Sequence, residues 1–265
     1  MANLKDSILD IFFPRHCLGC KILLSDETLS YICRTCLKNI PLTKGFACAF
    51  CKSPVRGGKT CVFCAKANHL DQLLVATSYE NPLVENVIKT TKYRFVRSLA
   101  SDMASLMSDY LKKKAAWLDS DNSIIIVPVP LHRRRLNWRG FNQAEIIALE
   151  IAGSFGWLSV PDMLKRTCNQ RPQADMPDRL SRIDNMRNVF ELQGKYQGRE
   201  YRGRPSVNWP SVNLIPLVGK TILLIDDIST TGSTLNDCAR ALKGAGAKEI
   251  IGFVFARGKL DKKDE

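Results

Sequence analysis

The chain has 265 residues, of which 45% are hydrophobic, enough to bury the core of one sizeable domain and a smaller module. Lysine and arginine outnumber aspartate and glutamate by 39 to 26, a net charge of +13 that favours phosphorylated or nucleic-acid partners. No apolar run is long enough to span a membrane, and Lys5, Asp6 and Asp10 interrupt the apolar patch near the N-terminus. We therefore expect a cytoplasmic protein without membrane insertion.

Eight of the ten cysteines form four Cys-x-x-Cys pairs before residue 65. Two residues between thiolates let a tight turn direct both sulfurs at one ion, and two such turns complete a closed tetrahedral zinc site. Because a cytosolic chain keeps its thiols reduced, zinc is favoured over disulfides, and we expect two structural Zn²⁺ sites. Sequential pairing of the turns is favoured and interleaved pairing stays open, with His16 and His69 as less favoured ligands. The expected ligands are Cys17, Cys20, Cys33, Cys36, Cys48, Cys51, Cys61 and Cys64.

Residues 15–66 hold too few large apolar side chains for a core of their own, so metal must supply their folding energy. We expect residues 1–68 to form the N-terminal segment with the metal module and residues 69–265 to form a second domain. The two remaining cysteines differ from the pairs. Cys168 lies in a polar segment, whereas Cys238 falls on an apolar helix face, where a packed structural thiol is expected.

Apolar strands alternate with helices through the second domain. Strands are predicted at 70–79, 123–130, 221–227 and 249–256, and helices at 83–118, 141–156 and 232–247. One apolar stripe that includes Phe95 predicts the first helix without a break. Strands that are apolar throughout, with helices between them, are typical of a parallel sheet covered on both faces, so we predict an α/β domain. Residues 165–190 and 193–219 lack such periodicity and are predicted as surface loops.

The stretch ILLIDDISTTGST, residues 222–234, carries a hydrophobic strand into two adjacent carboxylates and a loop of hydroxyl residues and glycine. A parallel strand that ends at Ile225 places Asp226 and Asp227 at the carboxyl edge of the sheet, where open α/β sheets bind ligands. Amides and hydroxyls ahead of a helix suit a phosphate, and paired carboxylates suit the vicinal hydroxyls of a sugar. A helix cap alone needs one hydroxyl, so we predict a ribose 5-phosphate ligand. The expected phosphate contacts are Ser229, Thr230, Thr231, Gly232, Ser233 and Thr234.

These thirteen residues resemble the phosphoribosyl pyrophosphate (PRPP) motif of type I phosphoribosyltransferases. In addition, VPVPLHRRRLNWRGFNQAEIIA (127–148), RTCNQRPQADMPDRLSRIDNMRNVF (166–190) and the cysteine-rich start are similar to the ComF family of competence proteins. This resemblance implies a type I phosphoribosyltransferase-like parallel sheet behind a double zinc ribbon, with PRPP and Mg²⁺ as ligands. It also implies a role in DNA uptake during natural transformation, with single-stranded DNA and DNA-uptake or recombination proteins as partners.

If the ligand is PRPP, cations near the end of a neighbouring strand must meet its pyrophosphate. The strand at 123–130 runs into a basic stretch with no acid between Asp121 and Glu145, and arginine forks suit phosphate oxygens. A solvated basic face is the alternative. The expected pyrophosphate contacts are His132, Arg133, Arg134, Arg135 and Arg139. A flexible loop within 165–190 is expected to close over the site, with contacts from Arg166, Gln173, Arg179 and Arg182.

Two classes of function stay open, because no acceptor pocket is recognisable. As a transferase, the protein would move the phosphoribosyl group from PRPP to a base or an amine, with Asp226 and Asp227 polarising the ribose hydroxyls. As a binding module, it would sense PRPP while its basic surface handles single-stranded DNA. The basic side chains of the long 193–219 segment either contact nucleic acid or solvate that loop; they are Lys195, Arg199, Arg202 and Arg204.

Overall fold

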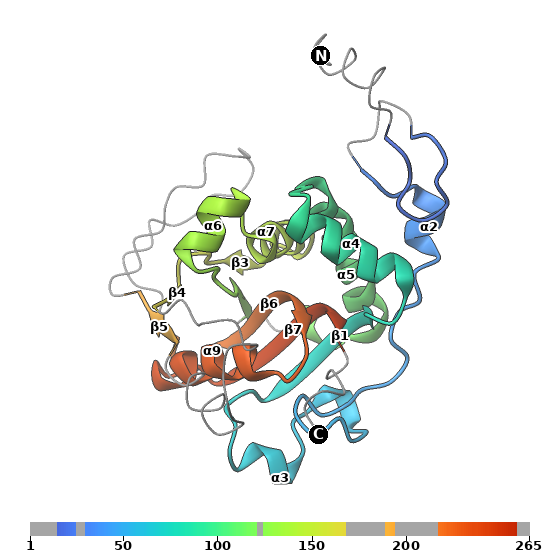
Figure 1. Cartoon of the computed structure of the whole chain (residues 1–265). Helices are drawn as coiled ribbons and strands as arrows, with labels where there is room; N and C mark the ends of the chain where they lie inside the picture. The colour runs from blue at the N-terminus through green and yellow to red at the C-terminus, as the bar shows by residue number, and fades with distance from the viewer. Residues whose placement is uncertain (1–14, 25–29, 121–123, 168–188, 194–216, 259–265) are drawn as a thin grey trace, which may run out of the picture.

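A five-stranded parallel sheet forms the centre of the second domain (Figure 1). The computed structural model describes residues 15–24, 30–120, 124–167, 189–193 and 217–258. The strand order is β1-β7-β6-β2-β3, and every pair is parallel. The strands are β1 (Gln72–Ser78), β2 (Ile124–Pro128), β3 (Leu158–Ser159), β6 (Thr221–Ser229) and β7 (Glu249–Arg257). The α/β class predicted from the alternating pattern is confirmed.

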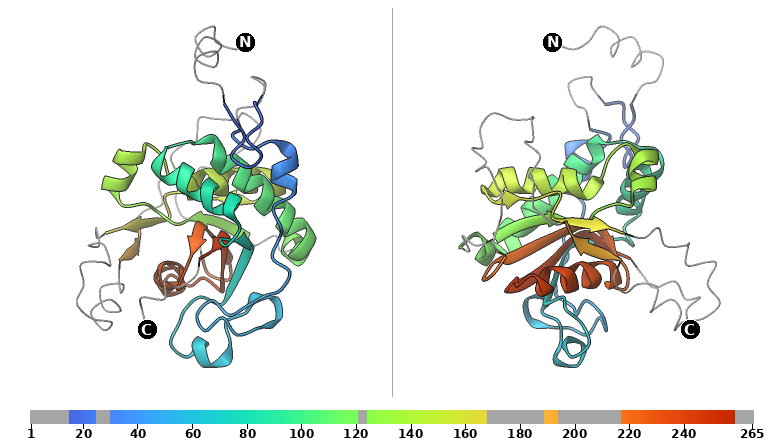
Figure 2. Two further views of the ribbon diagram at one scale, coloured as in Figure 1. Left: turned by 45° about the vertical axis from the view of Figure 1, so that its right-hand side comes forward. Right: turned by 90° about the vertical axis from the view of Figure 1, so that its left-hand side faces the viewer.

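Helices cover both faces of this sheet (Figure 2). Alternate side chains of β6 point to opposite faces: Leu223 packs with one set of helices, and Leu224 packs with the other. The first face carries α4 (Pro82–Tyr93), α5 (Ser98–Lys114) and α7 (Gln143–Phe155), and the second carries α9 (Ser233–Gly244). The shorter helices are α2 (Arg34–Lys38), η1 (Arg56–Gly58), α3 (Val62–Ala65), η2 (Ala116–Ser120) and α6 (Arg133–Arg139). Within the described ranges, no helix has the length and apolar character needed to cross a membrane.

The prediction of one helix over 83–118 is wrong, because α4 ends at Tyr93 and α5 begins at Ser98. Phe95 lies between them with φ of +59°, a left-handed conformation incompatible with a continuing right-handed helix. Its ring packs edge to face on Trp138 with the centroids 4.8 Å apart, instead of joining the apolar stripe in the core. A tertiary contact therefore outweighs the apolar spacing that predicted a continuous helix.

The polar segment predicted as a loop over 165–190 is ordered at both of its ends. There, β4 (Leu164–Arg166) and β5 (Phe190–Leu192) form an antiparallel pair that packs on the same face as α9. Phe190 and Leu164 are buried, and their burial is what the surface-loop prediction missed. Residues 168–188, including Cys168, and residues 194–216 lie outside the described residues. Cys238 of α9 is fully buried, as expected for a packed thiol.

The N-terminal module contacts the sheet domain at two separate places. Cys17, Ile32 and Ile40 join the core cluster that contains α4 and α5. Ala49 joins the opposite cluster, which contains α9. The chain between them crosses the edge of the sheet, where Leu42 bridges to Thr77 of β1. The two halves of the module therefore lie on opposite faces, as both views in Figure 2 show.

Candidate functional site

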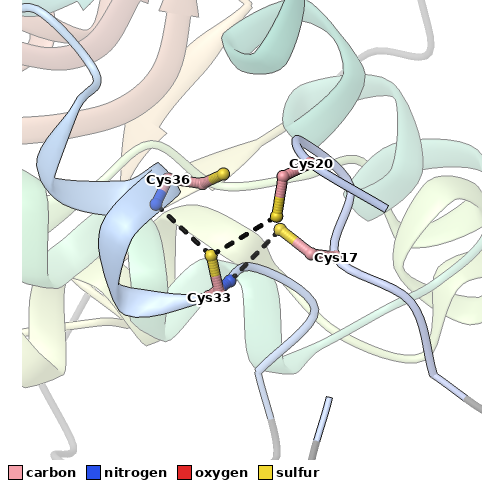
Figure 3. A group of neighbouring side chains, drawn as sticks. All are labelled: Cys17, Cys20, Cys33 and Cys36. Atoms are coloured by element: carbon pink, nitrogen blue, oxygen red, sulfur yellow. Dashed lines mark hydrogen bonds between the residues drawn. The ribbon is translucent and has the colours of Figure 1, made fainter. Parts of the chain in front are cut away.

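The eight paired cysteines form two groups of four, and the ligand atoms of each group lie within 4.8 Å of one another. The first cysteine group is Cys17, Cys20, Cys33 and Cys36, and the second cysteine group is Cys48, Cys51, Cys61 and Cys64. Sequential pairing is thus confirmed, and neither His16 nor His69 belongs to a group. Figure 3 shows the first cysteine group, whose side chains converge from two turns.

The geometry of both groups fits zinc. The sulfurs of Cys20 and Cys33 are 3.7 Å apart, and those of Cys51 and Cys61 are 3.6 Å apart. Four sulfurs around a tetrahedral Zn²⁺, with bonds of about 2.3 Å, lie about 3.8 Å apart. The Gly19 N–H and the Cys33 N–H donate to Cys17 Sγ at 3.4 Å and 3.3 Å, and such donors stabilise the thiolate that a metal requires. Each group therefore suits a structural zinc ion.

Asp226 and Asp227 lie where β6 and β7 continue beyond the end of β2. β2 ends at Pro128, opposite Ile225, whereas β7 stays paired with β6 as far as Ser229. The prediction that the strand ends at Ile225 is wrong, because β7 continues to pair with β6 beyond that residue, as far as Ser229. Asp226 and Asp227 consequently lie just past the carboxyl end of β2, at the edge where parallel α/β sheets bind ligands.

Asp227 is held by groups from two helices on the first face. Its carboxylate is 2% exposed, lies 3.0 Å from Lys92 Nζ and accepts a hydrogen bond of 3.1 Å from Gln143 Nε2. Gln143 in turn accepts a hydrogen bond from the buried guanidinium of Arg139. No local pattern in the sequence indicates Lys92, since its partner lies on a distant strand. Arg139, which the sequence predicts as a pyrophosphate contact, belongs to this buried chain of contacts.

Asp226 has a different environment. Its side chain is only partly buried, and one carboxylate oxygen accepts a 2.9 Å hydrogen bond from the Asp227 N–H. Burial, followed by repulsion from the Asp227 carboxylate, raises the pKa of Asp226. Asp226 is therefore the more accessible of the two carboxylates.

Residues 229–234, here called the hydroxyl loop, run from the last residue of β6 to the second residue of α9. Gly232 is the N-cap residue of α9, with φ of +79°, and as a glycine it has no side chain that could cap the helix. Thr230 and Thr231 are exposed, and Thr231 Oγ1 lies 2.8 Å from Ser233 Oγ. Ser229 Oγ is buried without a hydrogen-bond partner in the described part of the chain. The Ser233 N–H donates a hydrogen bond of 3.3 Å to Thr231 Oγ1, so the hydroxyls of the loop lie together at the N-terminus of α9.

The remaining predicted pyrophosphate residues follow β2 on α6. Arg133, Arg134 and Arg135 are exposed. His132 begins the helix, and its Nδ1 accepts a 3.2 Å hydrogen bond from the Arg134 N–H. Burial, followed by the charge of nearby arginines, lowers the pKa of His132, which keeps the ring neutral for this capping role. The arginines that precede Arg139 on α6 therefore face solvent, whereas Arg139 is buried.

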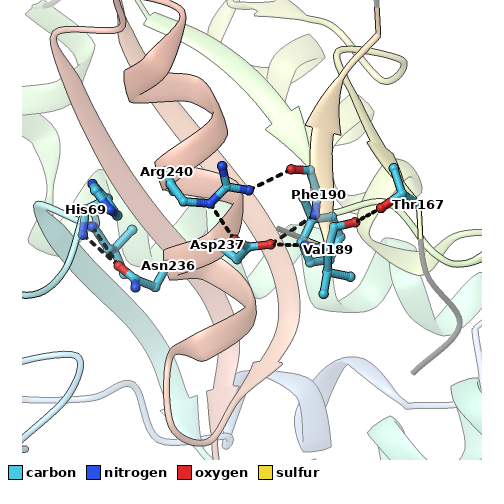
Figure 4. A network of polar contacts seen from close by, with 8 residues as sticks. His69, Thr167, Val189, Phe190, Asn236, Asp237 and Arg240 are labelled. Atoms are coloured by element: carbon cyan, nitrogen blue, oxygen red, sulfur yellow. Dashed lines mark hydrogen bonds and ion pairs between the residues drawn. The ribbon is translucent and has the colours of Figure 1, made fainter. Parts of the chain in front are cut away.

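The C-terminal end of the segment 165–190 is anchored to α9 through Val189 and Phe190 (Figure 4). Asp237 is buried, and its Oδ2 accepts hydrogen bonds of 2.7 Å and 3.0 Å from the N–H groups of Val189 and Phe190. Arg240 donates two hydrogen bonds: one of 2.7 Å from Nε to Asp237 Oδ1 and one of 3.0 Å from Nη2 to the Phe190 carbonyl oxygen. Arg166 lies in β4 with its guanidinium 5.5 Å from the Phe190 ring centre. Gln173, Arg179 and Arg182 lie outside the described residues.

An exposed aromatic and basic surface lies beside Asp227, and the sequence reasoning missed its aromatic part. Trp138 is 60% exposed and Tyr93 is 65% exposed, and Phe95 packs on Trp138. The arginines around them on the helix break and on α6 are also exposed. The aromatic–basic surface, as named here, consists of Tyr93, Arg94, Phe95, Arg97, Arg133, Arg134, Arg135 and Trp138. Its two halves are far apart in sequence, so no single local pattern identifies it.

Two family models match the chain, each over one of its parts. Residues 8–65 match the double zinc ribbon domain, and residues 164–265 match the phosphoribosyl transferase domain. These matches agree with the cysteine groups and with the parallel sheet that carries the acids and the hydroxyl loop.

Curated relatives cover most of the chain. Competence protein F of Haemophilus influenzae is 24% identical, with 86% of this chain and 97% of the relative covered. Competence protein ComFC of Bacillus subtilis is 28% identical, with 89% and 87% covered. DNA utilization protein YhgH of Escherichia coli is 26% identical, with 89% and 99% covered. The chain is therefore similar over most of its length to competence protein F and ComFC, and its two matched parts place a double zinc ribbon ahead of a phosphoribosyl transferase domain.

Proposed function

We propose that the chain binds PRPP, or another ribose 5-phosphate ligand, with Mg²⁺ at the carboxyl edge of β6. The supporting observation is that Asp226, Asp227 and the hydroxyl loop meet at one edge of the sheet, where β2 has already ended. Carboxylates accept hydrogen bonds from ribose hydroxyls, and the first turn of α9 suits the 5-phosphate. The phosphoribosyl transferase match over 164–265 supports the same assignment. We place the boundary between the two domains near residue 68.

In this proposal the pyrophosphate lies toward α6. Arg133, Arg134 and Arg135 would donate to its oxygens, and carboxylate oxygens at the strand edge are ligands that suit Mg²⁺. If transfer occurs, the bond from ribose C1 to pyrophosphate breaks and a bond to the acceptor nitrogen forms. The arginines and the metal would stabilise the departing negative charge, while Asp226 holds the ribose hydroxyls.

Calorimetry with PRPP and Mg²⁺ tests the binding step. The Asp226→Asn/Asp227→Asn variant should lose about 1–3 kcal/mol of binding free energy for each charge-assisted hydrogen bond. Glu85→Gln, which changes an exposed acid on α4, is the control and should bind as the parent does. A parent that does not bind PRPP would refute the proposal. Pyrophosphate release in the presence of a panel of bases and amines then separates a transferase from a non-catalytic PRPP sensor.

A second role, the handling of single-stranded DNA during DNA uptake, is proposed for the aromatic–basic surface. Single strands bind where arginines meet the backbone and exposed aromatic rings stack with bases, and Trp138 and Phe95 supply such rings. The similarity to two competence proteins and a DNA utilization protein supports this role, in which DNA-uptake or recombination proteins are partners.

Fluorescence anisotropy with a labelled oligonucleotide tests this second role. Trp138→Ala should weaken binding at every salt concentration, whereas Arg134→Ala should also reduce the salt slope by about 0.7 for each lost phosphate contact. Trp117→Ala, at another exposed tryptophan, is the matched control and should bind as the parent does. Competition by PRPP with Mg²⁺ would indicate that the two ligands share the α6 arginines. Absence of DNA binding at low salt would refute the role.

A further inference from the structure

The second cysteine group lies directly against the hydroxyl loop. A Cβ added at Gly232 would lie 3.4 Å from the Ala49 carbonyl oxygen and 3.4 Å from Phe50 Cε1. Ala49 and Phe50 are the two residues between Cys48 and Cys51, so they form the tip of a metal-binding turn. Gly232, the N-cap residue of α9, has a left-handed backbone conformation. The turn therefore packs on the apex of the loop.

Arg257 joins the same turn to the strand from which the loop departs. Its Nη1 donates a hydrogen bond of 3.0 Å to the Cys48 carbonyl oxygen, and its Nη2 donates one of 2.6 Å to the Ala49 carbonyl oxygen. Arg257 is also the last residue of β7 and pairs with Ser229, the first residue of the hydroxyl loop. One guanidinium fork thus fixes the metal-binding turn relative to the base of the loop.

Electrostatics favour this arrangement when zinc is bound. Four thiolates around one Zn²⁺ carry a net charge of −2, and the Arg257 guanidinium interacts with the charge of Cys48 and Cys51. A metal also rigidifies the turn, since both of its cysteines are fixed to one ion. The first cysteine group makes its core contacts on the opposite face, with α4 and α5.

We infer that the second zinc turn, through Arg257 and Phe50, positions the hydroxyl loop for its anionic ligand. The zinc module is then a wall of the ligand site as well as a neighbouring fold, and Arg257 is a positioning residue. This inference rests on the proposed function for the identity of the ligand. The physical coupling between turn and loop does not depend on that identity, and it has a readout of its own.

Phe50→Ala and Arg257→Lys test the coupling with all eight cysteines retained. Lysine keeps the charge but lacks the fork that holds both carbonyls. In the absence of ligand, hydrogen exchange of the amides in 229–234 should accelerate about tenfold in each variant, and the affinity for PRPP with Mg²⁺ should fall by a similar factor. Phe63→Ala is the matched control, because Phe63 belongs to the same cysteine module but is 80% exposed. It should change neither quantity.

Cys51→Ser removes one ligand from the second group and should reproduce both changes while zinc falls to about one ion per chain. Unchanged exchange in Phe50→Ala and Arg257→Lys, at about two zinc ions per chain, would overturn the inference, as would an equal effect of Phe63→Ala. If the exchange responds as expected but the parent does not bind PRPP, the proposed ligand is wrong and the coupling stands.

Discussion

Replacing Lys92 by methionine should lower the free energy of unfolding, because it leaves the buried Asp227 carboxylate without its cation. The ion pair measures 3.0 Å, and its side chains are 21% and 2% exposed. Removing one partner of a fully buried pair costs about 3–5 kcal/mol. Solvent contact of Lys92 and the remaining hydrogen bond from Gln143 reduce this loss, so we expect about 2–3 kcal/mol by urea unfolding.

The other ion pair of α4 supplies the control. Lys89 and Glu85 lie closer, at 2.7 Å, but are 57% and 41% exposed, so solvent screens their attraction and Lys89→Met should leave stability almost unchanged. A cycle with Asp227→Asn isolates the pair, since asparagine needs no counter-ion and the double variant should be more stable than Lys92→Met alone. Equal losses for the two lysine variants, or additive losses in the cycle, would refute the reasoning.

Metal analysis of the purified chain should give about two zinc ions, and a value near one would assign one cysteine group another role. Asp237→Ala should cost about 2–4 kcal/mol in urea unfolding, because the Val189 and Phe190 N–H groups lose a charged acceptor in the interior; a loss below about 1 kcal/mol would contradict this. Burial raises the pKa of Asp102 to about 6, against the opposing hydrogen bond from Ser30. The folded chain thus binds this proton more tightly than the unfolded chain, and stability should fall as pH rises from about 4 to about 6. Asp102→Asn should lack that part of the decline, on the order of 2 kcal/mol, and an equal decline would contradict the assignment.

The sheet and its covering helices were predictable because their signals are local. β2 is a short apolar run that is buried along its whole length, and α7 ends at Phe155 before its C-cap Gly156, whose φ of +70° glycine adopts without strain. The spacing of the cysteine pairs likewise indicated the two metal groups. In each case the residues that determine the structure are close together in the sequence.

The contacts that complete the site were not predictable, because each joins distant segments. Phe95 keeps the helical spacing of the apolar stripe, yet it lies in the left-handed break between α4 and α5 and packs on the distant Trp138. Arg139 belongs to the same basic stretch as Arg133, yet it is buried because α6 ends beside Gln143 and Asp227. Charge patterns therefore identified a basic stretch but not which of its cations face solvent.

The two adjacent acids have different surroundings, although they form one pair in the sequence. Asp227 already has a lysine and a glutamine as partners, so its negative charge is compensated before any ligand arrives. Asp226 accepts a hydrogen bond from a backbone donor, is repelled by its neighbour and feels the charge of Lys92 without the contact that Asp227 makes, so we expect a ligand hydroxyl or cation to bind there. Asp226→Asn should therefore weaken PRPP binding with little loss of stability, whereas Asp227→Asn should chiefly change the free energy of unfolding. Calorimetry and urea unfolding of the single variants measure both quantities, and identical profiles would show that the acids act as one unit.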